Sequence, residues 1–504
     1  MGASLDATAR SCAEALLAGM AGGEMDPVAY DTAWVARLVR RGDPRQLLFP
    51  ESLAWLLDAQ REDGSWGAGP ETLHDRIAAT LAAITTLADL LRRDVALAAP
   101  PEAVRAQVRA GEAYCHRRAP DLARDPWETV GFELVVPVLL DEARDLGLAL
   151  PWDAFGPVGE RRAAKLARLP QGWRQQAGAA MTHTLEGWGA AAEGRLPSLR
   201  GAGGSCANSP SATAFHYARS HDDSARSYLR ACVARGAGGV ADVYPFDVFE
   251  HAWVLDHLAV GGIDVPPAVF GQAVRHLAAA WGDGGRGVGI ASTGLEADAD
   301  DTAVVAAVLV RAGVPVDVRA LSPFRRPRGF ACFPFERNPS VSANIHAAYA
   351  LRALPFPGRE DALAAVHGFL ADMRRPEGCW LDKWHASPWY PTCRAVVALG
   401  GLWPELVAPA VEWLLDGQRA DGSWGHFWGT AEETAYAVEA LSQVAGDHPA
   451  AAGALARARP FLAQERGRPR PALWIGKGLY HPRRVVDAAV LAALRLSAAF
   501  AGAA

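Results

Sequence analysis

The chain has 504 residues, of which 50% are hydrophobic and 21% charged, a composition that excludes disordered and coiled-coil classes and predicts about two to four globular domains. A net charge of −6 gives no reason to expect a nucleic-acid partner. Seven scattered cysteines without a CxxC pair encode neither a disulfide framework nor a zinc site. Because the sequence shows no signal peptide or membrane-spanning run, we expect a cytoplasmic protein without integral membrane association.

Helical periodicity runs through the chain. Four segments carry apolar residues at a spacing of three to four, and Gly or Pro residues punctuate the sequence between such segments. In chain order these segments are residues 76–92, 132–148, 301–313 and 484–500. The alternating pattern typical of strands is almost absent, so we predict an all-α protein.

Two octapeptides repeat far apart in the chain. QREDGSWG at residues 60–67 and QRADGSWG at residues 418–425 match at seven of eight positions. Each follows an apolar helical pattern, so the Gln amide can reach turn backbone groups while the Trp ring packs on the preceding helix. Weaker copies occur near Trp281 and Trp380. Repeated helix-turn units that close on one another suggest two α/α barrels.

Tryptophan and lysine are used unusually. The chain has 17 tryptophans, many of them beside Gly, Pro or acidic residues, and only three lysines among its 50 basic residues. A large core explains aromatic bulk without any further role. The three lysines are Lys165, Lys383 and Lys477. We single them out because an ammonium is a compact point charge that suits phosphate.

An acidic cluster begins one of the predicted helices. The segment LEADADDTAVV contains Asp298, Asp300 and Asp301 in the pattern DxDD. Carboxylates at this place often cap a helix. Three carboxylates within four residues also repel one another, so one is expected to hold its proton at neutral pH while the helix amides stabilise its conjugate base. The cluster is therefore either a cap or a poised proton donor.

Five further segments accompany the DxDD cluster. In chain order they are DPVAYDTAWVARL (residues 26–38), LHDRIAATLA (73–82), GGVADVYPFDVFEHAWVLD (238–256), DKWHASPWYPT (382–392) and WIGKGLYHPRRVVDAAVLAAL (474–494). Together with DxDD they resemble class II diterpene cyclases over nearly the whole chain, and most closely the bacterial copalyl diphosphate synthase type. The resemblance implies an isomerase with two α/α-barrel domains and an active site between them. It also implies a β domain of residues 1–42 and 243–504, interrupted by a γ domain of residues 43–242.

The resemblance assigns the proton donor. In the family, the middle Asp of DxDD, here Asp300, protonates the terminal alkene of an isoprenoid diphosphate. An unactivated alkene is a very weak base, so the donor must be dry, positioned and held in its acidic form. Asp298 and Asp301 would then set the orientation and charge of Asp300. Asn344 is suited to hydrogen-bond this acid, with a satisfied helix-surface Asn as the alternative.

Aromatic and cationic side chains are expected to hold the substrate. Aromatic faces stabilise a carbocation without attacking it, although core packing is the alternative for each ring. The candidate rings are Phe246, Trp253, Phe333, Trp384, Trp389 and Tyr390. For the diphosphate we predict Lys383 and Lys477 together with Arg76 or Arg484, where the alternative for each is an ordinary helix-end cation.

The resemblance further implies Mg²⁺ and a retained diphosphate. Asp121, Asp125 and Glu128 are candidate metal ligands, although their spacing departs from the EDxxD pattern of the plant enzymes. A DDxxD cluster, which ionises the diphosphate in class I enzymes, is approached only by residues 141–145 on the polar face of a predicted helix. The diphosphate should therefore survive, and a separate class I synthase is the expected metabolic partner.

The sequence leaves alternatives for the length of the substrate, for the product and for the class of enzyme. The plant enzymes hold a water with a His and an Asn; His183 matches the His, but Asp242 stands where the Asn would be, so the product skeleton is open. Geranylgeranyl diphosphate would give a copalyl or labdane-type diphosphate, and farnesyl diphosphate a drimane-type one. A triterpene cyclase would be longer, with more repeats and an apolar insertion. An α/α-barrel glycosidase and a non-catalytic helical scaffold are further alternatives.

Overall fold

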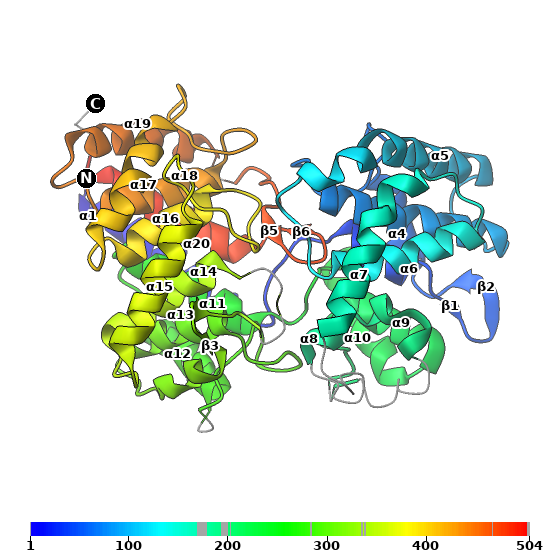
Figure 1. Ribbon diagram of the computed structural model, residues 1–504, viewed down its shortest axis with the longest axis horizontal. Coiled ribbons are helices and arrows are strands. Elements are labelled where there is room, and N and C mark those ends of the chain that lie inside the picture. The colour runs from blue at the N-terminus through cyan, green and yellow to red at the C-terminus, as the bar shows by residue number, and fades with distance from the viewer. Residues whose placement is uncertain are drawn as a thin grey trace.

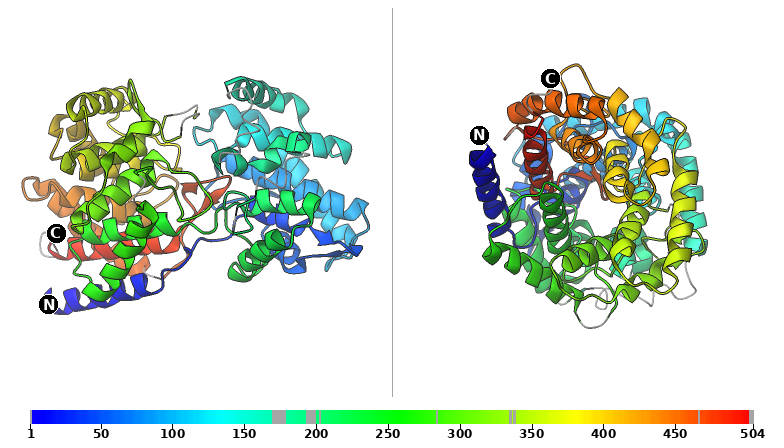
Figure 2. Two further views of the ribbon diagram at one scale, coloured as in Figure 1. Left: turned by 90° about the horizontal axis from the view of Figure 1, so that it is seen from below. Right: turned by 90° about the vertical axis from the view of Figure 1, so that its left-hand side faces the viewer.

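The computed structural model describes residues 2–168, 179–192, 200–201, 203–282, 285–333, 336, 339–465 and 467–500. In these ranges the chain forms two helical lobes that lie side by side (Figure 1). Seen along the long axis, helices stand around a common centre (Figure 2). The all-α prediction is confirmed, because the strands in the described ranges form only three two-stranded hairpins.

The first lobe contains the N-terminal helix and the C-terminal half of the chain. Its helices are α1 (Gly2–Ala18), α11 (Asp247–Val260), α12 (Pro267–Trp281), α13 (Ala299–Arg311), α14 (Val341–Ala353), α15 (Arg359–Met373), α16 (Trp389–Leu399), α17 (Pro404–Asp416), α18 (Ala431–Ser442), α19 (Pro449–Glu465) and α20 (Arg483–Ala498). A 3₁₀ helix (Val318–Phe324) precedes the hairpin of β3 (Arg325–Arg326) and β4 (Gly329–Phe330). One continuous core joins residues 9–28 to residues 243–493.

The second lobe contains the segment between the two halves of the first. Its helices are α2 (Ala29–Ala36), α3 (Pro50–Asp58), α4 (Leu73–Arg92), α5 (Pro101–Arg118), α6 (Phe132–Asp145), α7 (Gly156–Arg168), α8 (Ala179–Thr182), α9 (Pro210–Ser220) and α10 (Asp223–Arg235). Three 3₁₀ helices (Ala119–Arg124, Trp152–Phe155 and Leu185–Ala192) and the hairpin of β1 (Val39–Arg40) and β2 (Asp43–Leu47) complete it. Its core spans residues 29–240.

The two cores separate earlier in the chain than the predicted boundary at residue 42. Every residue of α2 is buried, and the helix packs against α3, α4 and α9 in the second core. The first crossing between lobes therefore lies between Val28 and Ala29, and the return crossing lies between Val240 and Val243. The apolar periodicity of α2 marks it as a core helix but does not say which core it joins.

The two octapeptide repeats adopt the same turn. Their Gln residues each donate to the carbonyl four residues later at 3.0 Å. Their Trp residues each donate from Nε1 to the carbonyl ten residues earlier at 2.7 Å. Between the Gln and the Trp of each repeat lies a glycine, Gly64 or Gly422, with φ of +88° or +85°, a conformation that glycine adopts without strain. Trp380 makes the same indole bond at 2.8 Å. The weaker copy near Trp281 extends into residues 283–284, which lie outside the described ranges.

A short hairpin of β5 (Trp474–Ile475) and β6 (Leu479–Tyr480) lies between the lobes (Figure 1). Ile475 and Leu479 pack against Trp127 of the second lobe, and the Val130 amide donates to the Gly476 carbonyl at 2.7 Å. Gly476 is required here, because a Cβ at this position would lie 2.2 Å from Oδ2 of Asp242. The hairpin therefore ties the lobes together. None of the helices that the structure describes is both long and apolar enough to cross a bilayer.

Candidate active site

The DxDD cluster lies at the start of α13, and its members play different parts. Asp298 is the N-cap: its Oδ1 accepts from the Asp301 amide at 2.8 Å. Asp298 and Asp301 are both buried. Asp300 is in the first turn, keeps 13% of its side chain exposed, and has its carboxyl oxygens bound by side chains of a neighbouring helix. The capping role is thus correct for Asp298, and Asp300 is available for chemistry.

Two residues of α14 hold the Asp300 carboxyl group. Nδ1 of His346 lies 2.5 Å from Oδ1, and Oγ of Ser342 lies 3.2 Å from Oδ2. The two residues are four positions apart, so they share one face of α14, which packs against α13. Asp382 fixes the start of this helix by accepting from the Val341 amide and from Ser342 Oγ, both at 2.8 Å.

The cluster does not ionise fully at neutral pH. Burial, with a contribution from Asp300, raises the pKa of Asp298 to about 7. Burial and the neighbouring Asp298 raise the pKa of Asp301 well above its ordinary range. These directions agree with the sequence prediction that a carboxyl group in the cluster retains its proton.

Replacing Asp298 with asparagine should weaken the pH dependence of stability. An unfolded Asp titrates near 3.9, whereas folded Asp298 titrates at about 7. Between these values the folded state binds a proton that the unfolded state has lost, so the free energy of unfolding falls as pH rises. Asparagine keeps the capping oxygen but does not titrate. Urea denaturation between about pH 5 and pH 7 should show a fall smaller by on the order of 1 kcal/mol in the variant. An unchanged slope would contradict the raised pKa.

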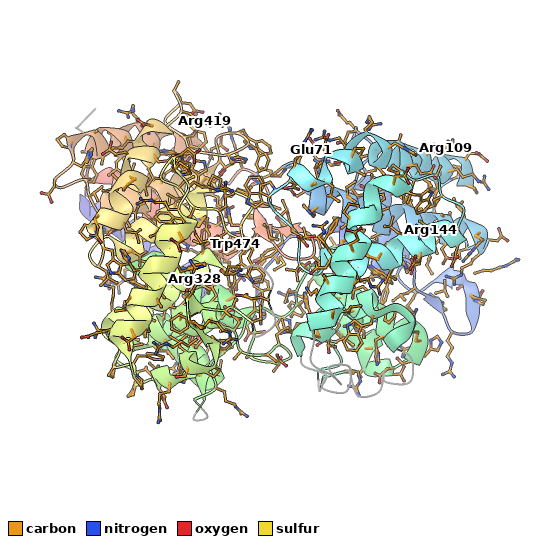
Figure 3. The ribbon with its side chains drawn as sticks, in the orientation of Figure 1. Glu71, Arg109, Arg144, Arg328, Arg419 and Trp474 are labelled. Atoms are coloured by element: carbon orange, nitrogen blue, oxygen red, sulfur yellow. The ribbon has the colours of Figure 1, made fainter. Side chains whose placement is uncertain are left out.

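Aromatic rings form a buried cluster beside Asp300. Nε1 of Trp253 donates to the Tyr390 hydroxyl at 2.9 Å, and the Trp253 ring lies 5.6 Å from that of His346. Phe249 stacks on Trp253 at 4.3 Å, and Trp474 lies 4.7 Å from Tyr390. Figure 3 shows Trp474 on the side of the first lobe that faces the second. Such a wall of π-faces can stabilise a cation that forms next to Asp300.

Two tyrosines show how close this cluster is to the acid. Burial raises the pKa of Tyr390 well above its ordinary range, and the charge of Asp300 adds to the shift. Burial also raises the pKa of Tyr480, to which Asp242, Asp301 and Asp300 all contribute. Tyr480 is therefore within electrostatic reach of the DxDD cluster and of Asp242 at the lobe interface, which agrees with an active site between the lobes.

The predicted rings divide between this cluster and ordinary packing. Trp253 and Tyr390 belong to the cluster. Phe246 is buried at its edge, with its ring centre 6.4 Å from that of Phe249. Phe333 and Trp384 pair at 6.2 Å beside Lys383. Trp389 lies outside this cluster, since its ring packs 4.1 Å from that of Trp413 at an angle of 35°, which is the core-packing alternative.

Sequence reasoning missed several rings of the cluster. Among them are Phe249, Trp474 and Tyr480. Phe249 precedes Trp253 by four residues, which places the two on one helix face. Trp474 and Tyr480 are the paired ends of the β5–β6 hairpin, so the motif WIGKGLY contained their signal.

The prediction for Asn344 is wrong. Its Oδ1 accepts from the Phe330 amide at 2.8 Å, and its Nδ2 donates to the carbonyls of Phe330 and Ser340 at 2.9 and 2.8 Å. The buried amide therefore joins α14 to β4 and does not contact Asp300. The residues that contact Asp300 are Ser342 and His346, which lie two positions before and two positions after Asn344. Helical spacing alone could have shown that these two residues share the opposite face of α14.

Lys477 is not placed to bind a diphosphate. Its Nζ is buried between Asp31 Oδ1 at 3.3 Å and Glu186 Oε1 at 3.2 Å, and it also donates to the hydroxyls of Ser209 and Ser211. Burial lowers the pKa of Lys477, but the carboxylates outweigh it and the net shift is upward. The ammonium is a buried structural cation in the interface.

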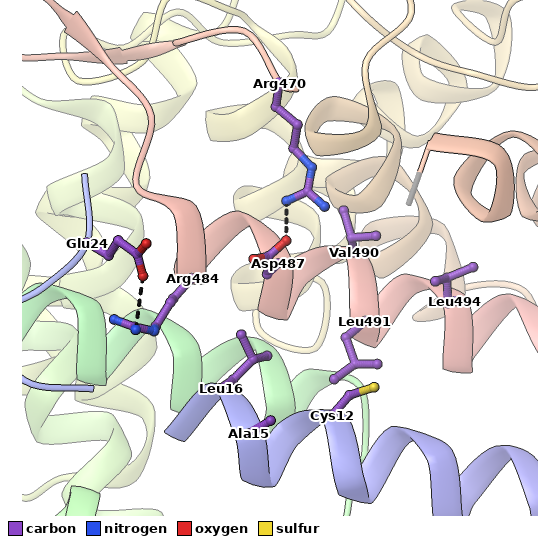
Figure 4. Close-up of a pocket in the computed structure, with 10 residues that line it drawn as sticks. All are labelled: Cys12, Ala15, Leu16, Glu24, Arg470, Arg484, Asp487, Val490, Leu491 and Leu494. Atoms are coloured by element: carbon purple, nitrogen blue, oxygen red, sulfur yellow. Dashed lines mark hydrogen bonds and ion pairs between the residues drawn. The ribbon is translucent and has the colours of Figure 1, made fainter. Parts of the chain in front are cut away.

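The two predicted arginines are also engaged elsewhere. Arg76 is buried and donates to Ser65 Oγ at 2.5 Å and to the Ala68 carbonyl at 2.8 Å in the second lobe, so the diphosphate prediction is wrong for it. Arg484 pairs with Glu24 at 2.9 Å and with Glu250 at 3.4 Å. It lines a pocket of about 340 Å³ between α1 and α20 (Figure 4). Both guanidinium groups therefore pair with residues other than Lys383 and Asp300.

Lys383 lies near the DxDD cluster. It pairs with Glu336, whose Oε1 accepts from the Cys332 amide at 2.9 Å, and its Nζ lies 4.7 Å from the centre of the Trp384 ring. Cys332 in turn lies beside Asp298. Among the four predicted cations, Lys383 has the position that suits a substrate headgroup next to the acid.

The predicted termination pair meets at Lys477. The carbonyl of His183 lies 3.2 Å from Lys477 Nζ, and Asp242 Oδ1 accepts from the Lys477 amide at 2.9 Å. Burial and the charge of Lys477 lower the pKa of His183 to about 3. Burial and Asp31 raise the pKa of Asp242 well above its ordinary range. At neutral pH His183 is therefore neutral, whereas the raised pKa of Asp242 favours its protonated form.

The predicted metal ligands do not converge. Asp121 pairs with Arg118 and Arg124, Asp125 accepts from the His74 amide at 3.0 Å, and Glu128 lies 3.4 Å from Arg161. The described ranges contain no group of three or more His, Cys, Asp or Glu side chains that could hold a metal ion. These residues therefore do not form a preformed metal cage.

Comparison with known proteins gives relatives over nearly the full length. The chain is 34% identical to a type B diterpene cyclase of Mycobacterium tuberculosis, over 94% of this chain and 96% of that protein. It is 35% identical to an ent-copalyl diphosphate synthase of a Streptomyces species, over 88% of each. No protein-family model matches the chain.

Solved structures agree with the sequence comparison. An ent-copalyl diphosphate synthase from Streptomyces platensis matches with a TM-score of 0.79 at 32% identity, over 98% of this chain and 100% of that one. Abietadiene synthase from Abies grandis matches with a TM-score of 0.72 at 25% identity, over 98% of this chain and 58% of that one. With a DxDD acid beside an aromatic cluster and relatives over nearly its whole length, the chain belongs to the class II diterpene cyclase family.

Proposed function

We propose that this protein protonates the terminal alkene of geranylgeranyl diphosphate and closes two rings to give a copalyl or labdane-type diphosphate. The observation that carries the proposal is the Asp300 carboxyl, which His346 and Ser342 hold beside the aromatic cluster. The Asp300 proton forms a C–H bond with the alkene, and the resulting tertiary cation lies against π-faces. Relatives named copalyl diphosphate synthase support the substrate and the product class.

We propose that His183 takes part in ending the reaction. Its Nδ1 lies 3.0 Å from the Ala207 carbonyl, which can only accept, so the proton is on Nδ1 and Nε2 keeps its lone pair. The raised pKa of Asp242 favours its protonated form, which is not a base. A neutral imidazole can accept the final proton, directly or through water.

The diphosphate is proposed to survive, which makes a separate class I synthase the downstream partner. Mg²⁺ is proposed as a counter-ion of the diphosphate, because Mg²⁺ commonly binds through one or two carboxylates and substrate phosphates rather than through a protein cage. A reducing compartment such as the cytoplasm is supported by the seven cysteines, none of which forms a disulfide.

Replacing Lys383 with methionine should raise the KM for the prenyl diphosphate by about tenfold, because a charge-assisted hydrogen bond to phosphate is lost. The thermal stability should change little, since the ion pair with Glu336 is partly exposed. Steady-state kinetics test this, with Lys165→Met as the matched control, because Lys165 pairs with Glu133 in the second lobe. An unchanged KM would remove Lys383 from the headgroup site.

The decisive experiment is incubation with geranylgeranyl or farnesyl diphosphate, with Mg²⁺ or with EDTA. Phosphatase treatment and mass spectrometry then identify the alcohol. A bicyclic C20 alcohol supports the proposal, and a drimane-type C15 alcohol from farnesyl diphosphate would establish the alternative substrate. If neither diphosphate is consumed, the proposed function is wrong. Release of sugar from glycans would instead indicate a glycosidase.

A further inference from the structure

A buried ionic chain lies behind His346. Arg394 of α16 is 2% exposed, and its Nε lies 3.3 Å from His346 Nε2. Its Nη2 donates to Asp256 Oδ2 of α11 at 2.6 Å. The other oxygen of Asp256 accepts from Arg311 at 2.6 Å, and Arg311 belongs to α13, the helix that carries Asp300. These ion pairs therefore place the Arg394 guanidinium against Nε2 of His346, the ring nitrogen that faces away from Asp300.

The hydrogen-bond geometry points to one protonation state of His346. A guanidinium has donors only, so His346 Nε2 must be the acceptor in its contact with Arg394. The ring then carries its proton on Nδ1 and donates to Asp300 Oδ1 at 2.5 Å. An imidazolium would need a second N–H on Nε2, directed at the Arg394 N–H and its positive charge. His346 is therefore held neutral next to a carboxyl group to which it would otherwise be the stronger base.

The other side of the acid is arranged in the same way. Ser342 has one hydroxyl proton, and its Oγ lies 2.8 Å from Asp382 Oδ2 and 3.2 Å from Asp300 Oδ2. Donation to Asp382 takes the shorter contact and leaves a lone pair of Oγ facing Asp300. Because Oδ1 of Asp300 accepts from His346, the acid proton belongs on Oδ2.

Resting on the proposed function, we propose that Arg394 is a positioning residue that holds His346 in its neutral Nδ1–H form and thereby keeps the proton on Asp300. In the reaction, the Oδ2–H bond breaks, the alkene π pair forms the new C–H bond, and the carboxylate left behind accepts the His346 hydrogen bond. Without Arg394, the proton would move to the imidazole and leave an ionised Asp300 that cannot protonate an alkene.

Other groups around His346 do not compete for this role. Among the described residues, Asp300 from α13, Arg394 from α16 and the Trp253 ring from α11 contact His346. Tyr390 on α16 and Asp256 on α11 bind Trp253 and Arg394, and Asp382 in the loop before α16 binds Ser342. The buried residues of α15, which also packs on α14, are all apolar. Arg394 is the cation that contacts the ring.

The first test compares pH–rate profiles of the full-length enzyme. Arg394→Met should lower kcat near pH 7 by about 10²-fold or more, because the proton then resides on His346 and not on Asp300. Adding His346→Asn to this variant should restore kcat by at least about tenfold, because the amide donates to Asp300 but cannot take its proton. Arg311→Met is the matched control, since Arg311 binds the same Asp256 but not His346, and its profile should follow the wild type.

The second test does not depend on turnover. Nitrogen-15 NMR of histidine-labelled protein, with the His346 signal assigned by its loss in His346→Asn, should show a neutral Nδ1–H ring from about pH 5.5 to pH 8. A charged His346 in the wild type at neutral pH would overturn the inference even if Arg394→Met does not fold. So would an Arg394→Met variant whose kcat stays within about tenfold of the wild type, or whose kcat His346→Asn does not restore. A wild type that consumes no prenyl diphosphate would overturn the proposed function instead, while the NMR result would still stand.

Discussion

An Asp300→Asn variant should cyclise its prenyl diphosphate at least about 10³-fold more slowly than the wild type. The amide can still accept from His346, but it has no acidic proton to give to an alkene. Stability should be nearly unchanged, because the cap of α13 is Asp298 and not Asp300. The measurement is the kcat from single-substrate time courses, with the melting temperature as the check on folding.

A matched control for this variant is available in the second lobe. Asp223 also lies in the first turn of a helix, α10, where it pairs with Arg226 at the surface. Asp223→Asn removes a carboxylate from an equivalent place and should leave kcat unchanged. If Asp300→Asn retained a rate within about tenfold of the wild type, another residue would have to be the proton donor.

A Lys477→Met variant should lose about 3–5 kcal/mol of unfolding free energy, because removing one partner leaves buried carboxylates without their counter-ion. Asp31 and Glu186 lie 3.3 and 3.2 Å from the ammonium, and all three side chains are fully buried. The partners of the ammonium lie in the second lobe, whereas Lys477 belongs to the β5–β6 hairpin between the lobes, so the loss should appear as a weakened interface. Urea denaturation monitored by tryptophan fluorescence measures it.

Lys165→Met is the control that separates the loss of a buried ion pair from the general effect of replacing a lysine. The Lys165–Glu133 pair is partly exposed, with 25% of the lysine side chain accessible, so its removal should cost about 1 kcal/mol or less. A Lys477→Met variant of normal stability but with a greatly raised KM would contradict the structural role and support the diphosphate role predicted from the sequence.

The sequence predicted chemistry well where a motif is local. DxDD is contiguous, and its position at a helix start follows from the apolar run after it, so both the cap and the spare carboxyl could be expected. The two octapeptide turns are equally local, since the Gln, Gly and Trp contacts all close within a few residues of the turn or on the helix before it.

Residues whose partners are distant in sequence were harder to predict. The rarity of lysine singled out Lys477, but rarity does not distinguish a substrate ligand from a buried counter-ion. Only the fold places Asp31 and Glu186 around it. The side-chain type of Asn344 suits it to hydrogen-bond an acid, whereas the helix face that meets Asp300 depends on how α14 packs against α13.

By itself, the sequence determined the helical class, the two repeat turns, the acid cluster and the family, because each depends on local spacing or on contiguous motifs. The tertiary structure decided which core contains α2, which face of α14 meets Asp300, and which cations are buried counter-ions. These outcomes depend on side chains that are far apart in the chain and are brought together only by packing. The contact between Arg394 and His346, which joins α16 to α14 behind the acid, is of this second kind.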